Sequence, residues 1–346
     1  MQILDAHFDA DSRIFTACTP EGFAVYRVWP LQLLRKRGIR ILCRYHKRIL
    51  TLPTILEFTG GTLRTVLPLH QTSLLFLLGG GASPLYPRNK VILWDDALGR
   101  VVAELEFRNE VCNIACRRGM LAVALKRRVV LFDVVEGEGG VRRVCEWDTC
   151  ENKGELSWCC EMRLWCGIEC GGGYVGLVAL ASAPGSTLLA IAGHRTGHIQ
   201  LIHLSPCPGP PNTPTPISKQ RSSRRPHSQS ASFIMAHTSG VTSLSVLPSG
   251  RLLATTSPQG TLIRIWDTHT GKLQNELRRG TDKAEIYGVA FTPDEKEVAV
   301  WSDKGTVHVF SLVGGSSRYV LSLVLWICLL MKHTLFAAIN NQSFHR

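Results

Sequence analysis

The sequence lacks the features of several protein classes. Only 19% of its 346 residues are charged against 45% apolar, which is a globular composition rather than a disordered one. Residues 1–13 contain three aspartates and no apolar stretch, so we expect no secretory signal. There is no Gly-x-Ser-x-Gly, Walker loop, His-Glu-x-x-His motif or paired catalytic carboxylate. We therefore expect a protein that is not an enzyme.

Metal-type cysteine spacing is also absent. The twelve cysteines include no Cys-x-x-Cys, and neither Cys159-Cys160 nor the 112/116 and 166/170 pairs have the spacing of a zinc site. The cysteines lie in apolar, strand-like runs of a large chain, which favours reduced thiols in the cytosol over a disulfide framework. We expect no metal and no cofactor.

Acidic residues are missing from two basic segments. Residues 27–56 carry eight Lys or Arg, and residues 205–233 carry four, with no Asp or Glu in either. Together they equal the whole net charge of +12, so the remainder of the chain sums to zero. This distribution argues against a nucleic-acid-binding face spread over the fold and suits loops that touch an anionic surface.

A repeat is present along most of the chain. Each unit has a short apolar strand, a turn containing Gly, and an alternating strand that ends in an aromatic residue or Asp, as β-hairpins do. The six units are residues 14–26, 74–95, 120–133, 188–204, 252–267 and 298–312. Two of them end in the Trp-Asp pair of WD repeats, at Trp94 and Trp266.

Such units predict an all-β fold, a WD-repeat β-propeller with six recognisable blades, because one unit cannot bury both of its faces alone. A two-sheet sandwich is the alternative. We expect the propeller over residues 1–312, with a basic insertion at 33–56, a disordered Pro- and Ser-rich loop at 206–232 and an atypical apolar tail at 313–346.

Two adjacent arginines, Arg278 and Arg279, are the most informative residues. They follow a strand-like segment, and successive side chains of an extended chain point to opposite faces. The pair therefore favours two separate pockets over one. A guanidinium binds phosphate oxygens through two parallel hydrogen bonds, which a lysine cannot do.

Residues of the kind found in anion pockets surround this pair in the sequence: hydroxyls, imidazoles and a Gly that lets backbone N–H groups approach a ligand. The alternative interpretation makes them ordinary strand and turn residues, with His237 as the structural His of many WD repeats. The double arginine between them favours the pockets. They are His237, Thr255, Ser257, Gly260, Thr261 and Arg264 before the pair and Ser302, Thr306 and His308 after it.

These motifs resemble the PROPPIN family, seven-bladed propellers of autophagy and vacuole biology with a Phe/Leu-Arg-Arg-Gly hallmark. The hallmark stands here as Leu-Arg-Arg-Gly at 277–280, and its Leu is closer to the fungal "homologous with swollen vacuole" branch. Further matches are Gly-Gly-Gly at 79–81, Trp-Asp-Asp at 94–96 and the Gly-x-x-x-Gly segment at 193–201. The resemblance covers residues 58–312 well and 1–30 acceptably.

The resemblance implies two phosphoinositide sites, for headgroups phosphorylated at inositol position 3 or at 3 and 5. The first site would use His237, Thr255, Ser257, Gly260, Thr261, Arg264 and Arg278. The second would use Arg279, Gly280, Ser302, Thr306 and His308. No Asp or Glu stands at these positions, as an anion site requires.

Two segments depart from the family. As a helix, residues 33–56 would place apolar and basic side chains on opposite sides, as in a membrane-surface helix, although Gly38 weakens it by about 1 kcal/mol. The alternative is an insertion without a role, such as retained intron sequence. The apolar run at 319–331 has thirteen residues, short of the roughly 20 that span a bilayer. It could be a replacement strand, an interfacial anchor or an aberrant terminus, and the seventh blade is expected to be missing or replaced.

The function expected from these features is a phosphoinositide-binding peripheral membrane effector in autophagy and vacuolar or endosomal trafficking. It would be cytoplasmic, bind vacuole, endosome or preautophagosomal membranes, and recruit autophagy or trafficking proteins through the propeller. The alternative is a protein-interaction propeller without lipid binding. Nucleic acid is not an expected partner, because the basic segments lack interleaved aromatics beyond Tyr45.

Overall fold

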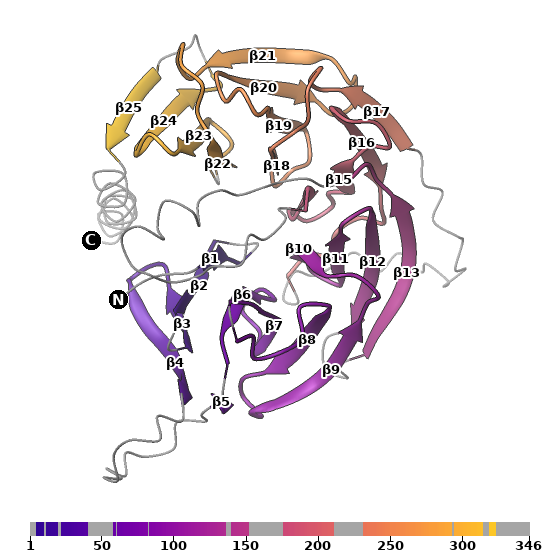
Figure 1. Ribbon diagram of the computed structural model, residues 1–346, viewed down its shortest axis with the longest axis vertical. Coiled ribbons are helices and arrows are strands. Elements are labelled where there is room, and N and C mark those ends of the chain that lie inside the picture. Colours follow the sequence, from indigo (N-terminus) through magenta and orange to yellow (C-terminus); the bar gives the residue numbers. More distant parts are fainter. Residues whose placement is uncertain are drawn as a thin grey trace, which may run out of the picture.

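The architecture is that of an all-β propeller with six sheets (Figure 1). The structure, a computed structural model, describes residues 5–9, 12–19, 22–40, 58–59, 61–81, 83–135, 140–151, 176–210, 231–292, 294–313 and 318–322. Within these residues the regular elements are all strands. The six separate sheets exclude the two-sheet sandwich.

The first three blades take up the N-terminal half. Blade 1 comprises β1 (Asp5–Phe8), β2 (Ile14–Thr19), β3 (Gly22–Arg27), β4 (Gln32–Arg40) and the short β5 (Phe58–Thr59), which pairs with β4 in parallel. Blade 2 comprises β6 (Leu63–Pro68), β7 (Leu74–Gly79), β8 (Lys90–Asp95) and β9 (Arg100–Glu106). Blade 3 comprises β10 (Val111–Arg117), β11 (Met120–Leu125), β12 (Arg128–Val135) and β13 (Gly140–Asp148).

The remaining three blades follow in the same order. Blade 4 comprises β14 (Val178–Leu180), β15 (Leu188–Ala192), β16 (His198–His203) and β17 (Ala231–Met235). Blade 5 comprises β18 (Ser243–Val246), β19 (Leu252–Thr256), β20 (Leu262–Asp267) and β21 (Leu273–Arg278). Blade 6 comprises β22 (Ile286–Phe291), β23 (Glu297–Ser302), β24 (Thr306–Ser311) and β25 (Arg318–Ser322).

The six repeat units correspond to the two middle strands of the six blades, so this prediction is confirmed. These strands are the most buried because sheets pack on both of their faces: β7, β11, β15 and β19 are buried along their whole length. The outer strands are exposed and carry the charges, as in β9 and β13. Burial therefore decreases from the middle of each blade to its rim.

Apolar side chains join successive blades into one arc. Phe76 and Leu93 of blade 2 pack with Val123 and Val130 of blade 3, and the same kind of cluster lies between each later pair of blades. Polar contacts add to them. The fully buried Arg117 of β10 donates from its Nη atoms to the carbonyls of Ser186 (2.8 Å) and Ser205 (2.6 Å), and so ties blade 3 to blade 4.

The helical alternative for residues 33–56 is wrong for residues 33–40. These residues form most of β4, where Gly22 lies opposite Gly38, and a Cβ on Gly22 would stand 1.9 Å from the Arg37 carbonyl oxygen. The close approach of the two strands therefore requires glycine at position 22, and Gly38, which would weaken a helix, stands opposite it in β4. As an outer strand, β4 can carry basic side chains in solvent. Residues 41–56 lie outside the described residues.

The end of the propeller was placed too early at residue 312. Strand β25 pairs with β24, from Thr306 opposite Ser322 to Phe310 opposite Arg318, and completes the sheet of blade 6. The outer strand follows the connection after Leu312. It is needed because the backbone N–H and C=O groups on that side of β24 require hydrogen-bond partners. The loop expected at 206–232 begins with described residues 206–210 and ends inside β17, and residues 211–230 between them lie outside the described part.

Candidate functional site: the ends of β20 and β21

Arg278 and Arg279 lie at the end of β21, the outer strand of blade 5, and differ sharply in burial. Arg278 is exposed, whereas Arg279 is only 5% exposed. Arg278 lies opposite Leu262, and the Arg279 amide donates to the Thr261 carbonyl (2.9 Å), so the extended pairing with β20 continues through the pair. Neighbouring side chains in such a strand face opposite sides of the sheet. The two arginine side chains therefore lie in separate environments, as two separate pockets would require.

The face that carries Arg278 looks toward blade 4. In the register of blade 5, Thr255 lies opposite Arg264 and Arg264 opposite Glu276, which places these side chains on the same face as Arg278, two residues beyond Glu276. Arg264 donates from Nη1 to the carbonyl of Ala236, which directly follows the last strand of blade 4 (2.7 Å). The seam between blades 4 and 5 thus holds the residues of the first predicted site.

Thr255 and His237 also take part in hydrogen bonds within the protein. The Trp266 indole donates to Thr255 Oγ1 (3.0 Å), and the same hydroxyl lies 3.0 Å from His237 Nε2. Burial, and after it the positive charge of Arg264, lowers the pKa of His237 to about 4. His237 is therefore neutral near pH 7. This geometry matches the alternative interpretation of His237 as a structural residue, and its binding role stays a prediction.

Arg279 faces the other way, into the turn that leads to blade 6. Its Nε donates to the Gly260 carbonyl and its Nη2 to the Asp282 carbonyl, both at 2.6 Å. These two acceptors are backbone carbonyls and carry no net charge. Gly260 has φ +62°, and a Cβ there would stand 1.8 Å from the Ala284 carbonyl oxygen, so only glycine fits. The guanidinium is thus fixed at the seam between blades 5 and 6.

The second predicted site lies across that seam. Ser302 is opposite Ile286, and Ile286 is the side chain nearest to Gly260, 3.3 Å from where its Cβ would be. Ser302, Thr306 and His308 lie on the same face of blade 6, since His308 is opposite Val300. Thr306 Oγ1 lies 3.3 Å from His308 Nε2. The buried Ser302 hydroxyl has no hydrogen-bond partner among the described residues.

The structure therefore divides the predicted residues between two seams. One group lies at the seam between blades 4 and 5, and the other lies at the seam between blades 5 and 6. The first comprises His237, Thr255, Arg264 and Arg278, and the second Arg279, Ser302, Thr306 and His308. Ser257, Gly260 and Thr261 form the turn between β19 and β20 that separates the two groups. Gly280 follows in open space, where a Cβ would meet nothing within 4 Å, so packing does not require glycine there.

One residue of the site was missed from the sequence. The Glu276 carboxylate accepts from Arg264 Nε (2.9 Å), so an acidic group does stand beside the first set of basic residues. Strand alternation gives the signal that could have found it, because Glu276 lies two residues before Arg278 and shares its face. Glu276 partly neutralises Arg264 and leaves Arg278 as the more exposed cation of this seam.

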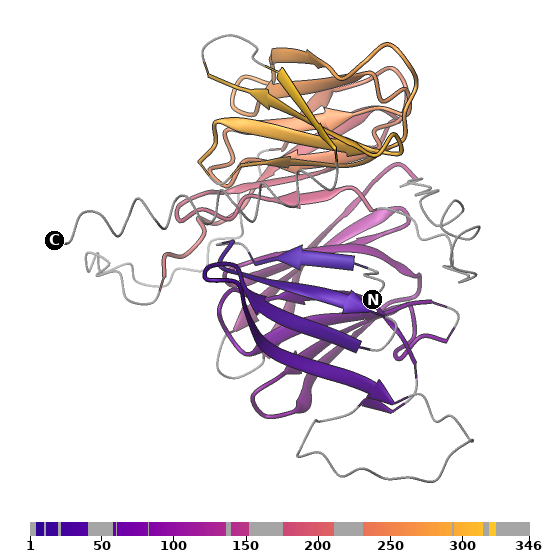
Figure 2. The ribbon, with the colours of Figure 1, turned by 90° about the vertical axis from the view of Figure 1, so that its left-hand side faces the viewer.

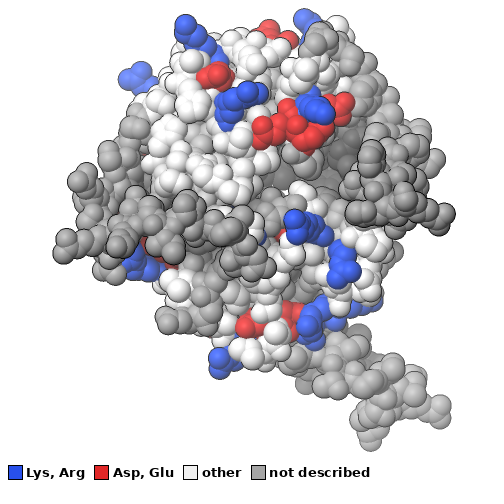
Figure 3. Space-filling model, turned by 180° about the vertical axis from the view of Figure 1, so that it is seen from behind, with Lys and Arg blue, Asp and Glu red and all other residues white. Residues whose placement is uncertain are grey.

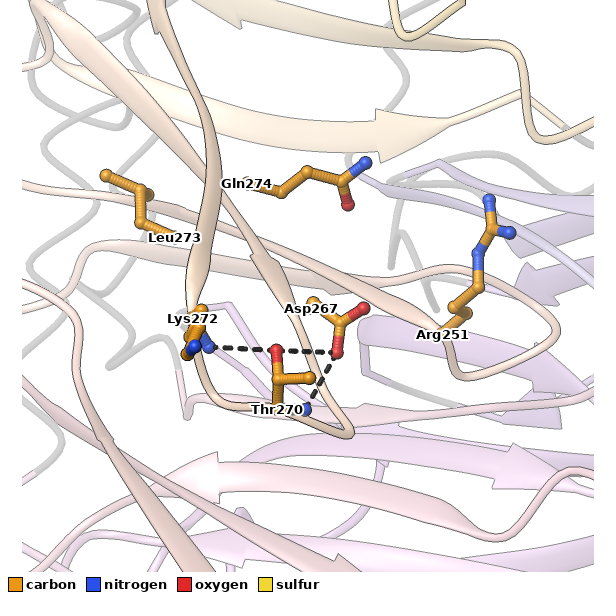
Figure 4. A pocket seen from close by; sticks show the side chains of 6 residues that line it. All are labelled: Arg251, Asp267, Thr270, Lys272, Leu273 and Gln274. Carbon is orange, nitrogen blue, oxygen red and sulfur yellow. Dashed lines mark hydrogen bonds between the residues drawn. The ribbon is translucent and has the colours of Figure 1, made fainter.

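A hollow of about 320 Å³ lies at the opposite end of blade 5 (Figure 4). Arg251, Asp267, Thr270, Lys272, Leu273 and Gln274 line it. Asp267 Oδ1 accepts from the Thr270 hydroxyl and amide, which closes the turn and lowers the pKa of that carboxyl. The hollow is open and none of the predicted site residues lines it.

Charges on the described surface are mixed in sign. Figure 3 shows Lys and Arg interspersed with Asp and Glu on the face seen from behind, without one field of a single sign. Among the residues that the structure describes, no helix is long and apolar enough to cross a membrane.

Comparisons with known proteins agree with this architecture. The family model "WD domain, G-beta repeat" matches residues 228–267, the segment that contains β17 to β20. The structure of Kluyveromyces lactis Hsv2 has a TM-score of 0.59 at 21% identity, over 90% of this chain and 75% of that one. A second structure, titled "Complex of KlAtg21 with coiled-coil of AgAtg16", has a TM-score of 0.56 at 17% identity, over 90% and 82%. These likenesses show the propeller fold.

Sequence relatives show the family. The chain is 30% identical over 316 residues to "SVP1-like protein 2" of Pichia angusta, covering 91% of this chain and 71% of that protein. It is 28% identical to the protein of the same name from Debaryomyces hansenii, of which it spans 66%. With the Leu-Arg-Arg-Gly segment at the end of β21, this degree of identity and coverage shows that the chain belongs to the PROPPIN family of WD-repeat β-propellers.

Proposed function

We propose that this protein is a non-catalytic membrane effector that binds phosphoinositide headgroups at the seams on either side of blade 5. The ligands are headgroups phosphorylated at inositol position 3, or at 3 and 5. The protein acts in autophagy and in vacuolar or endosomal trafficking, on the cytoplasmic side of those membranes. Through the propeller it recruits proteins of the same processes.

The opposite orientation of Arg278 and Arg279 is the observation that supports two sites. Each guanidinium stands at a different seam: Arg278 shares the face of Arg264, and Arg279 is bonded to the Gly260 and Asp282 carbonyls at the seam to blade 6. Guanidinium groups and hydroxyls are donors that suit phosphate oxygens. Two modest sites on one rigid body also strengthen each other on a membrane, because binding at the first raises the effective concentration at the second.

Flotation of the protein with vesicles tests this function. Vesicles of phosphatidylcholine with phosphatidylinositol 3-phosphate should carry the wild type, and the double variant Arg278→Thr/Arg279→Thr should lose at least about tenfold of the binding, because a hydrogen bond to a charged group contributes about 1.5–3 kcal/mol. The matched control is Arg251→Thr, an exposed arginine at the other end of the same sheet. Equal flotation of double variant and wild type would overturn the lipid sites.

The competing function is a protein-interaction propeller without lipid binding. A propeller of similar fold is titled as a complex with a coiled coil, which makes protein binding a credible activity of this architecture. The same flotation experiment distinguishes the two functions. A wild type that fails to float would support the scaffold, whereas a wild type that floats and a double variant that folds normally and fails to float support the lipid effector.

A further inference from the structure

The turn between β3 and β4, together with the start of β4, carries a concentrated group of exposed apolar side chains. Of the twelve large apolar side chains that are exposed in the described part of the chain, four lie here, namely Trp29, Leu31, Leu33 and Leu34. Trp29 is 40% and Leu31 53% exposed. A folded protein normally buries such side chains or scatters them singly, so a group of four indicates a contact surface.

This run of residues 29–34, the apolar tip, stands at a free edge of the molecule. Blade 1 is the first sheet of the arc, and among the described sheets only blade 2 packs on it. Figure 2, which looks at the open side of the arc, shows the β1–β4 sheet in front of the sheets that follow it. Residues 28–31 form the turn, and Leu33 and Leu34 lie directly beyond it in a bulge opposite Tyr26. The four apolar side chains therefore gather at the end of one hairpin.

Cations flank the apolar tip, and carboxylates are missing from both of its strands. Residues 22–40, which comprise β3, the turn and β4, contain five Arg or Lys and no Asp or Glu. Asp96 of blade 2 pairs with two of the five. Arg27 and Lys36 are exposed and form no ion pair within the described part of the chain. The hairpin therefore presents uncompensated positive charge next to its apolar end.

This combination matches the chemistry of an anionic bilayer surface. The amphipathic Trp ring favours the level of the lipid headgroups, and Leu side chains favour the boundary with the acyl chains. Each Lys or Arg near an anionic surface strengthens binding about fivefold. Arg27 lies two residues before Trp29, and Lys36 lies two residues after Leu34. Both cations can therefore reach the headgroups when the apolar tip enters the interface.

The apolar tip is separate from the proposed headgroup sites. It joins the third and fourth strands of blade 1, as the turn at residues 268–272 does in blade 5. That turn precedes β21, whereas Arg278 ends the same strand. The apolar tip thus corresponds to the end of a blade that faces away from the two arginines, and it belongs to neither seam of blade 5.

We propose that the apolar tip inserts into the surface of a bilayer that contains anionic phospholipid. Trp29, Leu31 and the two leucines of β4 enter the boundary between headgroups and acyl chains, while Arg27 and Lys36 bind the lipid phosphates. The contact recognises negative surface charge and no particular headgroup. It goes beyond the proposed function, and neither binding mode requires the other.

Flotation with vesicles of phosphatidylcholine and phosphatidylserine, free of phosphoinositide, tests the insertion. The wild type should float, and Trp29→Ser/Leu31→Ser should lose at least about tenfold of the binding. The matched control Phe233→Ser/Met235→Ser removes two comparably exposed apolar side chains from the outer strand of blade 4 and should float like the wild type. A wild type that does not float, or equal flotation of the wild type and the Trp29 variant, would overturn the proposal.

Two charge variants place the contact. Arg27→Gln/Lys36→Gln should weaken flotation with the same vesicles at least about fivefold. Arg278→Thr/Arg279→Thr should float with them like the wild type, even where it fails to bind vesicles of phosphatidylcholine with phosphatidylinositol 3-phosphate. Loss of flotation in the second variant alone would place the contact at blade 5 and contradict the role of the apolar tip.

Photocrosslinking covers the case of altered folding. A benzophenone amino acid replaces Leu31, a single change in an exposed turn, and the protein is irradiated on the phosphatidylserine vesicles. We expect links to phospholipid acyl chains, identified by mass spectrometry. The same amino acid at Phe233 should give none. A link from position 31 to a second copy of the chain, or no link to lipid, would overturn the proposal.

Discussion

Blade 5 and blade 1 are built from the same four-stranded unit but are held in different ways. Blade 5 packs on both faces, with apolar clusters toward blades 4 and 6 and with Arg264 and Arg279 hydrogen-bonded across or beside the two seams. Blade 1 packs on blade 2 alone among the described sheets, and there it adds a buried ion pair between Arg37 and Asp96. The two blades thus share an architecture and differ in their anchoring.

This difference shows that the contacts between blades, more than the sheets themselves, determine the role that each blade can take. At blade 5, polar groups can stand at the seams because apolar contacts on both sides already hold the sheet in place. At blade 1, a single apolar interface, the buried ion pair and hydrogen bonds such as that from Thr65 to Asp5 carry the attachment. Substitutions at the two blades should therefore differ in their effect on the free energy of unfolding, and such variants test the comparison.

The largest effect is expected at the attachment of blade 1. Asp96, only 4% exposed, accepts a hydrogen bond from Arg37 Nε at 2.7 Å and forms an ion pair with Arg35 Nε at 3.2 Å. Asp96→Ala leaves the buried Arg37 charge without its carboxylate, which should cost about 3–5 kcal/mol of unfolding free energy. Chemical denaturation measures this loss. The control Glu104→Ala breaks an exposed pair with Lys90 and should cost less than about 1 kcal/mol. Equal losses would show that the ion pair does not anchor blade 1.

A smaller effect is expected from the buried imidazole of blade 5. The pKa of His237 is lowered to about 4, so the unfolded chain binds a proton more readily than the folded one between pH 6.5 and 4. The contribution of His237 to the free energy of unfolding is therefore fully present above pH 6.5 and is lost as the pH falls toward 4. From pH 7.5 to 5 the loss from this group should be about 2 kcal/mol.

Denaturation at the two pH values in wild type and in His237→Gln measures this contribution. The variant lacks the titrating group, so its stability should depend less on pH by that amount. The same pH dependence in both proteins would mean that His237 is accessible to protons in the folded state, and the internal hydrogen bond to Thr255 would then not be its main role.

Substitutions of the two arginines should differ in their effect on stability, because the two side chains differ in burial. Arg279→Thr removes the hydrogen bonds to the Gly260 and Asp282 carbonyls and should cost about 1–3 kcal/mol. Arg278→Thr, at an exposed position, should stay within about 0.5 kcal/mol of the wild type. Thermal unfolding of the two single variants gives the comparison. Similar melting temperatures would contradict the fixed position of Arg279 at the turn.

The middle strands of each blade could be predicted from the sequence because they are buried on both faces, which leaves runs such as Leu74–Gly79 almost entirely apolar. The outer strand β4 could not, since its pattern is set by pairing with β3 rather than by burial, and its basic residues are compatible with an amphipathic helix. Strand β25 was missed for a similar reason. Only the partner β24 shows that residues 318–322 belong to a sheet.

The opposite faces of Arg278 and Arg279 could be predicted from strand alternation, which is a local property. Their different burial could not, because it depends on the turn at residues 280–284 and on the approach of Gly260 to Ala284. The hydrogen bond from Trp266 to Thr255 also depends on register. Sequence reasoning therefore identified residue types and directions, and tertiary contacts decided which side chains are already bonded within the protein.

Stoichiometry of headgroup binding tests the two-site account most directly. Calorimetric titration with soluble inositol 1,3-bisphosphate should give two sites per chain for the wild type and for Arg251→Thr, and one site for each of Arg278→Thr and Arg279→Thr. Circular dichroism confirms that the variants remain folded. A single site in the wild type, or the loss of both sites from either single substitution, would contradict separate pockets on the two faces of blade 5.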